Sequence, residues 1–292
     1  MKPLFFAELV TLAALWGASF LFMRMGAPEF GPVVLITLRT GIAAVFLLPL
    51  VIWSKKWQSI KQNYHLLLVV GVVGTAIPFT LLSYAVLTVS AGYASIINAT
   101  APIFTAIIAW LWVKDELSIS ALGGLMVGFA GVVILTFDKQ GNTGGINILP
   151  VLAGLGATLC YGIGSNFTKQ KLSHVHPLAL ACGSQLAAAI SLLPVSLWFL
   201  PSQIPAQQAW VSVTLLGVAC TGIAYILYFR LIANVGVNKA MTVTYLIPFF
   251  GVVWGIIFLQ EALSVHMLTG GLFILAGVSL STGIFARKDR RL

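Results

Sequence analysis

The chain has 292 residues, of which 59% are hydrophobic and only 8% are charged. A soluble domain carries roughly 25% charged residues, so this composition cannot cover a water-facing surface and excludes an ordinary soluble domain. The formal net charge of +9 does not indicate binding to nucleic acid, because the basic residues stand singly or in pairs between apolar runs.

Ten apolar stretches are long enough to cross a lipid bilayer, which requires about 20 mostly apolar residues per helix. They do not alternate between polar and apolar residues, as membrane strands would. The first stretch lacks a small-residue cleavage site and is expected to be a retained span rather than a signal peptide. The expected spans are residues 5–23, 32–53, 65–87, 93–113, 119–137, 149–168, 176–200, 209–231, 240–259 and 266–285.

The basic residues are distributed unequally between the two sides that these spans define. If the N-terminus is cytoplasmic, thirteen of the sixteen Lys and Arg residues fall on the cytoplasmic side. Arg24 and Lys139 fall on the other side, and Arg39 lies within a span. Because basic loops stay in the cytoplasm, the sequence predicts a multi-pass protein of the cell inner (cytoplasmic) membrane with both termini cytoplasmic.

The two halves of the chain share a spaced pattern of proline, glycine and small residues. A shift of 145 places Pro32–Pro49 on Pro177–Pro194, and a shift of 146 places Pro102 on Pro248. Each half contains five spans, and because five is odd the second half starts on the opposite side of the membrane. The pattern predicts an all-α membrane protein of ten transmembrane helices in two inverted five-helix repeats, an architecture typical of carriers that bind substrate near the midplane.

Several motifs together carry a family resemblance over nearly the whole chain. They are LWGASF at 15–20, Pro32 followed by Arg39, the mid-span Pro102 and Pro248, the acidic loops KDELS at 114–118 and QEALS at 260–264, and the glycine-rich fifth and tenth spans. This set resembles the EamA-type branch of the drug/metabolite transporter (DMT) superfamily. The resemblance implies EamA-type repeats at residues 1–140 and 146–287, a central cavity, and transport of small metabolites, often export.

The two halves also differ from each other. Tyr161-Gly162 stands where the first half has Trp16-Gly17, and Ser184 stands where symmetry with Arg39 would place an arginine. The halves are therefore not chemically equivalent. From the resemblance and the polar content, we expect spans 1, 3 and 4 and their partners 6, 8 and 9 to line the pathway.

The mid-span prolines predict free backbone carbonyls deep in the membrane. Proline has no N–H, so Pro102 frees the carbonyl of Asn98 and Pro248 frees that of Thr244. Backbone irregularity at this depth is tolerated where it lines a cavity or is covered by protein. We expect these carbonyls to line the pathway; the alternative is a kink that serves only packing.

Aromatic, amide and hydroxyl side chains inside the spans are further candidates. A cavity with aromatic walls and a few polar groups suits a partly apolar, neutral or zwitterionic solute, while core packing is the alternative for each residue. The expected substrate-binding residues are Trp16, Ser19, Arg39, Tyr84, Asn98, Tyr161, Asn166, Tyr225, Thr244 and Tyr245.

Arg39 is a special case because it lies about seven residues, or roughly 10 Å of helix rise, into its span. A charged side chain at that depth has a partner or faces water. Three interpretations remain open for Arg39: it reaches the outer interface, it pairs with a carbonyl or carboxylate, or it binds an anionic group of the substrate.

The seven acidic residues are all in loops or tails except Glu8, which lies near the inner end of the first span. Without a carboxylate at the midplane, a proton-coupled pump for cationic drugs lacks its central residue. Glu8 is kept as a hypothetical proton site that a Glu8→Gln variant would test.

Enzyme and cofactor motifs are not found in the sequence. Cys160, Cys182 and Cys220 lie in apolar stretches without metal-ligand spacing, and HExxH, GxSxG and Walker A patterns are missing. We expect no enzyme activity, no metal and no cofactor, and no direct use of ATP.

The favoured interpretation is a secondary transporter that exports or exchanges small-molecule metabolites such as amino acids by alternating access around a midplane cavity. Ten spans can form a complete carrier as a monomer. The alternatives are a cationic drug efflux carrier, a passive channel, or a membrane scaffold that transports nothing.

Overall fold

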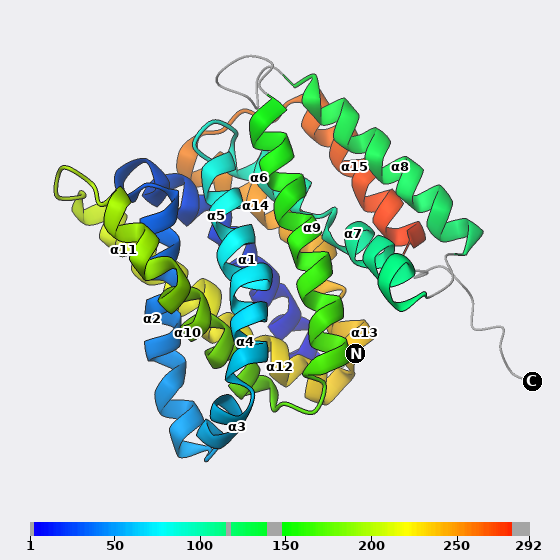
Figure 1. Ribbon diagram of the computed structural model, residues 1–292. Helices are drawn as coiled ribbons and strands as arrows, with labels where there is room; N and C mark the ends of the chain where they lie inside the picture. Colours follow the sequence, from blue (N-terminus) through cyan, green and yellow to red (C-terminus); the bar gives the residue numbers. More distant parts are fainter. Residues whose placement is uncertain (1–2, 115–117, 139–147, 282–292) are drawn as a thin grey trace, which may run out of the picture.

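The computed structural model describes residues 3–114, 118–138 and 148–281, and within these ranges every regular element is helical (Figure 1). In the first half the elements are α1 (Pro3–Phe30), α2 (Pro32–Trp53), α3 (Trp57–Gln62), α4 (Tyr64–Gly71), the π-helical η1 (Val72–Ala76), α5 (Ile77–Ala85), α6 (Ala91–Asn98), α7 (Ala101–Ile108), the π-helical η2 (Ala109–Val113) and α8 (Ile119–Thr136).

The second half contains α9 (Ile148–Lys171), α10 (Pro177–Ser196), the 3-10 turn η3 (Leu197–Phe199), α11 (Gln207–Gly217), the π-helical η4 (Val218–Ile223), α12 (Ala224–Val235), α13 (Val237–Ala240), α14 (Val243–Leu259) and α15 (Val265–Ser281). The predicted all-α class is thus confirmed for the described residues. Most of the acidic loop at 114–118 and the basic residues Lys2, Lys139 and 287–291 lie outside them.

Eight helical segments are long and apolar enough to cross a membrane: Pro3–Phe30, Pro32–Trp53, Tyr64–Ala85, Ala91–Trp112, Ile119–Thr136, Ile148–Lys171, Pro177–Phe199 and Gln207–Val235. They coincide with the first eight predicted spans. The last two predicted spans correspond to the shorter apolar helices Val243–Leu259 and Val265–Ser281.

Local sequence signals explain where several helices begin. Pro32 and Pro177 occupy the first turns of α2 and α10, where the missing N–H of proline costs nothing. Ser90 and Ser118 precede α6 and α8, and their hydroxyls accept hydrogen bonds from the amides of Tyr93 and Ala121, both at 3.1 Å. Such caps satisfy amides that have no partner inside the helix.

The mid-span prolines behave differently from each other. Pro102 lies in the first turn of α7, after a break that separates α6 from α7. Pro248 lies inside α14, which continues through it. Only the first of these two prolines therefore interrupts its helix.

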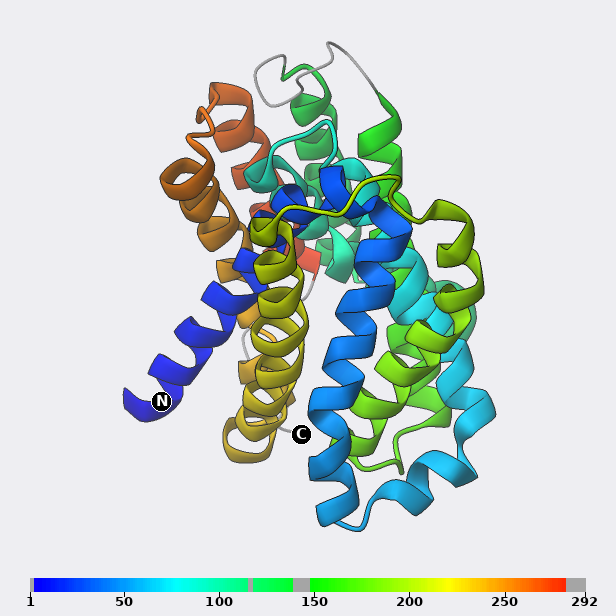
Figure 2. The same ribbon diagram turned by 90° about the vertical axis from the view of Figure 1, so that its left-hand side faces the viewer.

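The helices form one bundle whose two ends can be named from the chain path (Figure 2). At the N-terminal end α1 starts, α2 stops and α14 starts, whereas at the far end α1 stops, α6 starts and α14 stops. α8 and α15 pack side by side at one edge (Figure 1). Their backbones touch there, because a Cβ added to Gly277 would lie 2.4 Å from the Gly128 nitrogen.

The buried core is divided unequally between the two ends. The largest cluster joins late α1, early α2 and the α5–α6 connection at the far end, and extends to α8 and α15. Toward the N-terminal end there are two smaller clusters. One joins the second half of α2 with α4, α9 and α10, and the other joins early α1 with α12, α13 and early α14.

Candidate functional site

A cavity of about 280 Å³ lies between the two smaller core clusters and the large one. Its walls come from α1, α2, α5, α9, η4, α12 and the start of α14. The lining residues are Trp16, Ser19, Phe20, Met23, Arg39, Phe79, Leu82, Tyr161, Ser165, Cys220, Thr221, Tyr225, Tyr228, Met241 and Thr244.

The cavity is closed toward the far end and exposed toward the N-terminal end. Met23 and Leu82, which face the far end, are only 1% and 2% exposed. Met241 lies between α13 and α14 at the N-terminal end and is 43% exposed, and Ser165 near the end of α9 is also exposed. The exposed lining residues thus lie toward the N-terminal end, and the most buried ones lie toward the far end.

Arg39 contributes the only charged side chain among the lining residues. It is 4% exposed, and its Nε–H donates to the Thr221 hydroxyl at 3.0 Å. Its Nη1 contacts the sulfur of Met23 at 3.7 Å, and its Cζ lies 3.7 Å from the ring centroid of Phe79. In the described part of the chain, the groups that contact the guanidinium are all neutral.

The π-helical turn η4 positions the partner of Arg39. Thr221 lies in η4, and its hydroxyl donates to the Leu216 carbonyl five residues earlier, at 2.8 Å. A π turn widens the helix locally and is frequent at functional sites. Here it places the Thr221 oxygen on the cavity wall, where the hydroxyl can accept from Arg39.

Aromatic rings form the remaining walls. Tyr161 meets Phe79 edge to face with centroids 6.2 Å apart, and Trp16 packs against Tyr228 at 5.2 Å. Tyr225 is also a lining residue, and its ring stacks on Phe229 with centroids 5.9 Å apart. The cavity thus combines one cation and several hydroxyls with large apolar faces, as small-molecule sites do.

The structure brings six of the ten predicted binding residues to this cavity: Trp16, Ser19, Arg39, Tyr161, Tyr225 and Thr244. The other four are not among the lining residues. Tyr84 is 43% exposed and Tyr245 packs against the large core cluster. Asn166 donates to the carbonyls of Thr105 and Gly162 at 3.0 and 2.9 Å, and the Asn98 Oδ1 is buried with no hydrogen-bond partner among the described residues.

The expectation for the lining helices needs correction at two spans. No lining residue comes from α6 or α7, which form the fourth predicted span, whereas α2 contributes Arg39. In the fourth span α6 packs against α14, and α7 packs against α9. The predicted pairing of Asn98 with Thr244 in one site is therefore not seen; only Thr244 lines the cavity.

Sequence reasoning missed nine lining residues: Phe20, Met23, Phe79, Leu82, Ser165, Cys220, Thr221, Tyr228 and Met241. Thr221 could have been found, because a shift of 146 pairs it with Thr75. The apolar members carry no signal that separates them from ordinary core residues. Cys220 lies in an apolar stretch of the sequence, and it is fully buried in the cavity wall.

No carboxylate from the described residues lines the cavity. Glu8 is 8% exposed and pairs with Arg230 at 2.9 Å, outside the lining. Of the three interpretations of Arg39, the outer interface is excluded by its burial. No carboxylate lies within 4.0 Å of its nitrogens in the part of the chain that is described.

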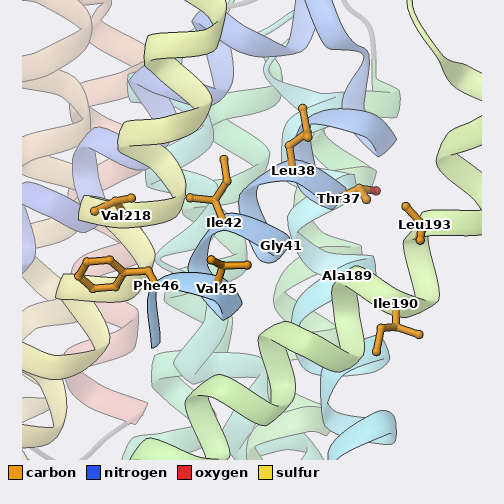
Figure 3. Close-up of a pocket in the computed structure, with 10 residues that line it drawn as sticks. All are labelled: Thr37, Leu38, Gly41, Ile42, Val45, Phe46, Ala189, Ile190, Leu193 and Val218. Carbon is orange, nitrogen blue, oxygen red and sulfur yellow. The ribbon is translucent and has the colours of Figure 1, made fainter. Parts of the chain in front are cut away.

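A larger apolar groove of about 630 Å³ lies on the outside of the bundle, between α2, α10 and η4 (Figure 3). Val45 on the rim of the groove is 71% exposed. The single side-chain hydroxyl among the residues that line the groove belongs to Thr37, and it already donates to the Val33 carbonyl. A groove of this kind can hold lipid chains but offers no group that would recognise a polar solute. The smaller cavity around Arg39 is therefore the better candidate site.

Comparisons with known proteins show the family of the chain. The model of the EamA-like transporter family matches residues 4–137 and 148–283. The chain is 24% identical over 289 residues to the uncharacterized transporter YoaV of Bacillus subtilis (strain 168), covering 96% of this chain and 97% of that protein. It is also 24% identical over 281 residues to a probable terminal-alkyne amino-acid exporter of Streptantibioticus cattleyicolor, covering 93% and 91% of the two chains.

A solved structure titled only "Crystal structure of protein" shares the fold, with a TM-score of 0.68 at 17% identity over 99% of this chain and 100% of that one. The family match covers nearly the whole chain, which confirms the resemblance found in the motifs. The relatives named above are transporters, not enzymes. The chain therefore belongs to the EamA-like transporter family, and it is a multi-pass membrane transporter.

Proposed function

We propose that this protein is a secondary transporter that exports or exchanges small metabolites, amino acids among them, by alternating access around the Arg39 cavity. The observation that carries the proposal is the asymmetry of the cavity, which is closed by buried residues at the far end and exposed at the N-terminal end. A carrier caught with one side open has this form, because the site must reach one face of the membrane at a time.

An inverted duplication would supply the second state, and several paired features support it. At a shift of 146, the π-helical η1 pairs with η4. Lys114 and Gln260, also related by 146, both have left-handed backbone conformations, with φ of 57° and 54°. The two family matches support repeats at residues 1–140 and 146–287, with five spans each.

Polar contacts at the far end support the same mechanism. The Arg24 guanidinium donates to the Val86 carbonyl, joining α1 to the end of α5. The Glu261 carboxylate accepts from the amides of Ala91 and Gly92 at 2.7 and 3.1 Å, joining the end of α14 to the start of α6. These contacts cross between helices that must separate if the far end opens.

The positive loops favour placing the N-terminal end in the cytoplasm, with both termini on that side. The described structure then corresponds to the state open to the cytoplasm. Substrate would bind at Arg39 from inside the cell and leave after the far end opens. Ten spans are sufficient for this cycle within a monomer.

Amino acids are the favoured solutes for two reasons. The cavity, at about 280 Å³, is near the lower limit of small-molecule sites, which span about 300–1,000 Å³. The relative from Streptantibioticus cattleyicolor is named as a probable exporter of an amino acid. A cationic drug carrier is disfavoured, because the lining holds a cation and no carboxylate.

The test is counterflow in proteoliposomes loaded with an amino-acid mixture, following uptake of each labelled member. Ser165→Trp fills the open part of the cavity and should abolish uptake. Leu159→Trp is the matched control, because Leu159 is an exposed residue of the same helix α9 that does not line the cavity.

Saturable uptake that depends on the preloaded solute, is lost in Ser165→Trp and is kept in Leu159→Trp supports the carrier. Uptake that does not depend on preloading indicates a passive channel. Equal uptake by both variants contradicts the assignment of this cavity, and uptake of no amino acid contradicts the proposed solute class.

A further inference from the structure

We infer that Arg39 is the recognition point for a carboxylate, so that the transported solutes are monoanionic or zwitterionic acids with an apolar part. This inference deepens the proposed function and depends on it. It starts from the charge of Arg39, which is retained at all physiological pH values, and from the contacts that the structure gives its guanidinium.

The burial of Arg39 requires compensation. A buried charge without a partner costs several kcal/mol in a protein interior, and an ionisable residue inside a membrane span marks a functional site by default. Arg39 is 4% exposed, so bulk water does not solvate most of it. The cost must be offset by groups in the cavity.

The protein supplies only neutral groups for this purpose. The Thr221 hydroxyl accepts from Nε, the Met23 sulfur lies near Nη1, and the Phe79 ring faces the guanidinium plane. Nη2 has no hydrogen-bond partner among the described residues. A guanidinium has five N–H donors in a flat fork, so most of its donor capacity remains for a ligand.

The ionisable groups around the guanidinium do not neutralise it either. The ionisable side chains that interact electrostatically with Arg39 are Tyr161 of α9, Cys220 of η4 and Tyr225 of α12. Phenols and thiols keep their protons near neutral pH. The cavity thus has a net charge of about +1 until a solute brings a negative group.

One positive charge and a planar fork favour a carboxylate over a phosphate ester. A phosphate ester carries about −1.5 to −2 charges at neutral pH, and the lining offers no second cation to balance it. A carboxylate carries a single charge and can accept two parallel N–H bonds from arginine. The fit in both charge and geometry points to the carboxylate.

The rest of the cavity indicates how such a solute would lie. Arg39 contacts the buried Met23, which faces the far end, whereas the aromatic walls of Tyr225 and Tyr228 continue toward the exposed Met241. The carboxylate would therefore enter first, and an aliphatic or aromatic part would lie against the tyrosines. An amine group is accommodated but is not what Arg39 recognises.

The experiment compares solutes that differ only in the recognised group. Purified protein in proteoliposomes is offered labelled leucine, leucinamide, 4-methylpentanoate and 3-methylbutylamine, in wild type and in Arg39→Gln and Arg39→Lys. Melting temperatures with unlabelled 4-methylpentanoate and 3-methylbutylamine report binding independently of transport. The melting temperature of each variant without solute shows whether it is folded.

In the wild type we expect the two carboxylates to be taken up at least about tenfold faster at low concentration than the amide and the amine, since a charged hydrogen-bonded pair discriminates by at least that factor. Arg39→Gln should reduce this preference to within about twofold, and Arg39→Lys should recover part of it. A purely structural role of Arg39 would lower all four uptakes together and leave their ratio unchanged.

The outcomes separate this inference from the proposed function. Saturable counterflow that treats leucine and leucinamide alike in the wild type overturns the carboxylate and keeps the carrier. A wild type that is neither stabilised by 4-methylpentanoate nor able to transport either carboxylate overturns the inference. If 4-methylpentanoate raises the melting temperature of the wild type but not that of Arg39→Gln, the carboxylate site is supported. This holds even if no counterflow is measured and the proposed carrier function is contradicted.

Discussion

At the far end of the bundle, Arg24 donates to the Val86 carbonyl, and Glu261 binds the amides at the start of α6. A shift of 145 pairs Arg24 with Lys169 at the N-terminal end, and a shift of 146 pairs Val86 with Ile232. Lys169 is exposed, and within the described residues no hydrogen bond joins it to α12. Similar residues thus form a contact at one end and leave it unformed at the other.

The two ends therefore differ in how their helices pack and not in which residue types they contain. The far end has one continuous core and polar bonds across it, while the N-terminal end has two smaller core clusters with the cavity between them. Two arrangements of similar segments are what a two-state carrier needs, because a solute can only shift populations between states that the chain can already adopt. Three substitutions test this difference between the two ends.

The largest effect is expected from Gly251→Leu, which disrupts the packing of the middle of α14 on α6. A Cβ added to Gly251 would lie 2.3 Å from the Ser95 hydroxyl, so α14 could no longer pack closely on α6. Overpacking of this kind costs about 1–3 kcal/mol. The melting temperature in detergent should fall clearly.

Gly41→Leu is the control, because nothing lies within 4 Å of a Cβ added to Gly41 in the same kind of helical setting. It should leave the melting temperature within a few degrees of wild type. Equal losses in both variants would contradict the close contact between α14 and α6.

An intermediate effect is expected from Glu261→Gln, which keeps the shape of the side chain but removes its charge. A carboxylate at a helix N-terminus contributes about 0.3–1 kcal/mol through the helix dipole, and up to about 2 kcal/mol where partly buried. The far end should then open more often. Labelling would be measured in a protein without the three native cysteines that carries Val89→Cys, a fully buried position at that end. This cysteine should react several-fold faster with a hydrophilic maleimide when Glu261→Gln is also present than when Glu261 is kept.

Glu29→Gln is the matched control at the same end. Glu29 accepts from the amide of Ala206 at 3.3 Å but is exposed, and exposed pairs contribute little. Labelling of Val89→Cys should hardly change in this variant. Unchanged labelling in Glu261→Gln would show that this contact does not hold the far end closed.

The smallest effect on stability is expected from Lys169→Gln, compared with Arg24→Gln. No hydrogen bond joins Lys169 to α12 among the described residues, so its loss should leave the free energy of unfolding within about 0.5 kcal/mol of wild type. If Lys169 closes the N-terminal end in the other state, counterflow should nevertheless slow. Arg24→Gln should lower the melting temperature more, because it breaks an existing bond.

Wild-type rates of counterflow in Lys169→Gln would remove Lys169 from the closure of the N-terminal end. Equal destabilisation by both variants would contradict the open and closed assignment of the two ends.

The helices could be predicted from the sequence because apolar length alone dictates them: in a membrane each backbone amide must be bonded inside its own segment. Arg39 also stood out in the sequence, since a charge inside an apolar span needs a partner or water. The break at Pro102 and the continuity at Pro248 could not be told apart, because both prolines stand in the same kind of apolar stretch.

Which residues share the cavity was decided by the tertiary structure. Tyr161 and Tyr84 are both tyrosines within apolar spans, yet Tyr161 lines the cavity and Tyr84 lies on the outside. A helix in lipid can be apolar all round, so its sequence lacks the polar stripe that would set which face turns inward. Length and charge therefore determined the spans and singled out Arg39, while the packing of helix on helix determined the rotation of each span and hence which side chains meet it.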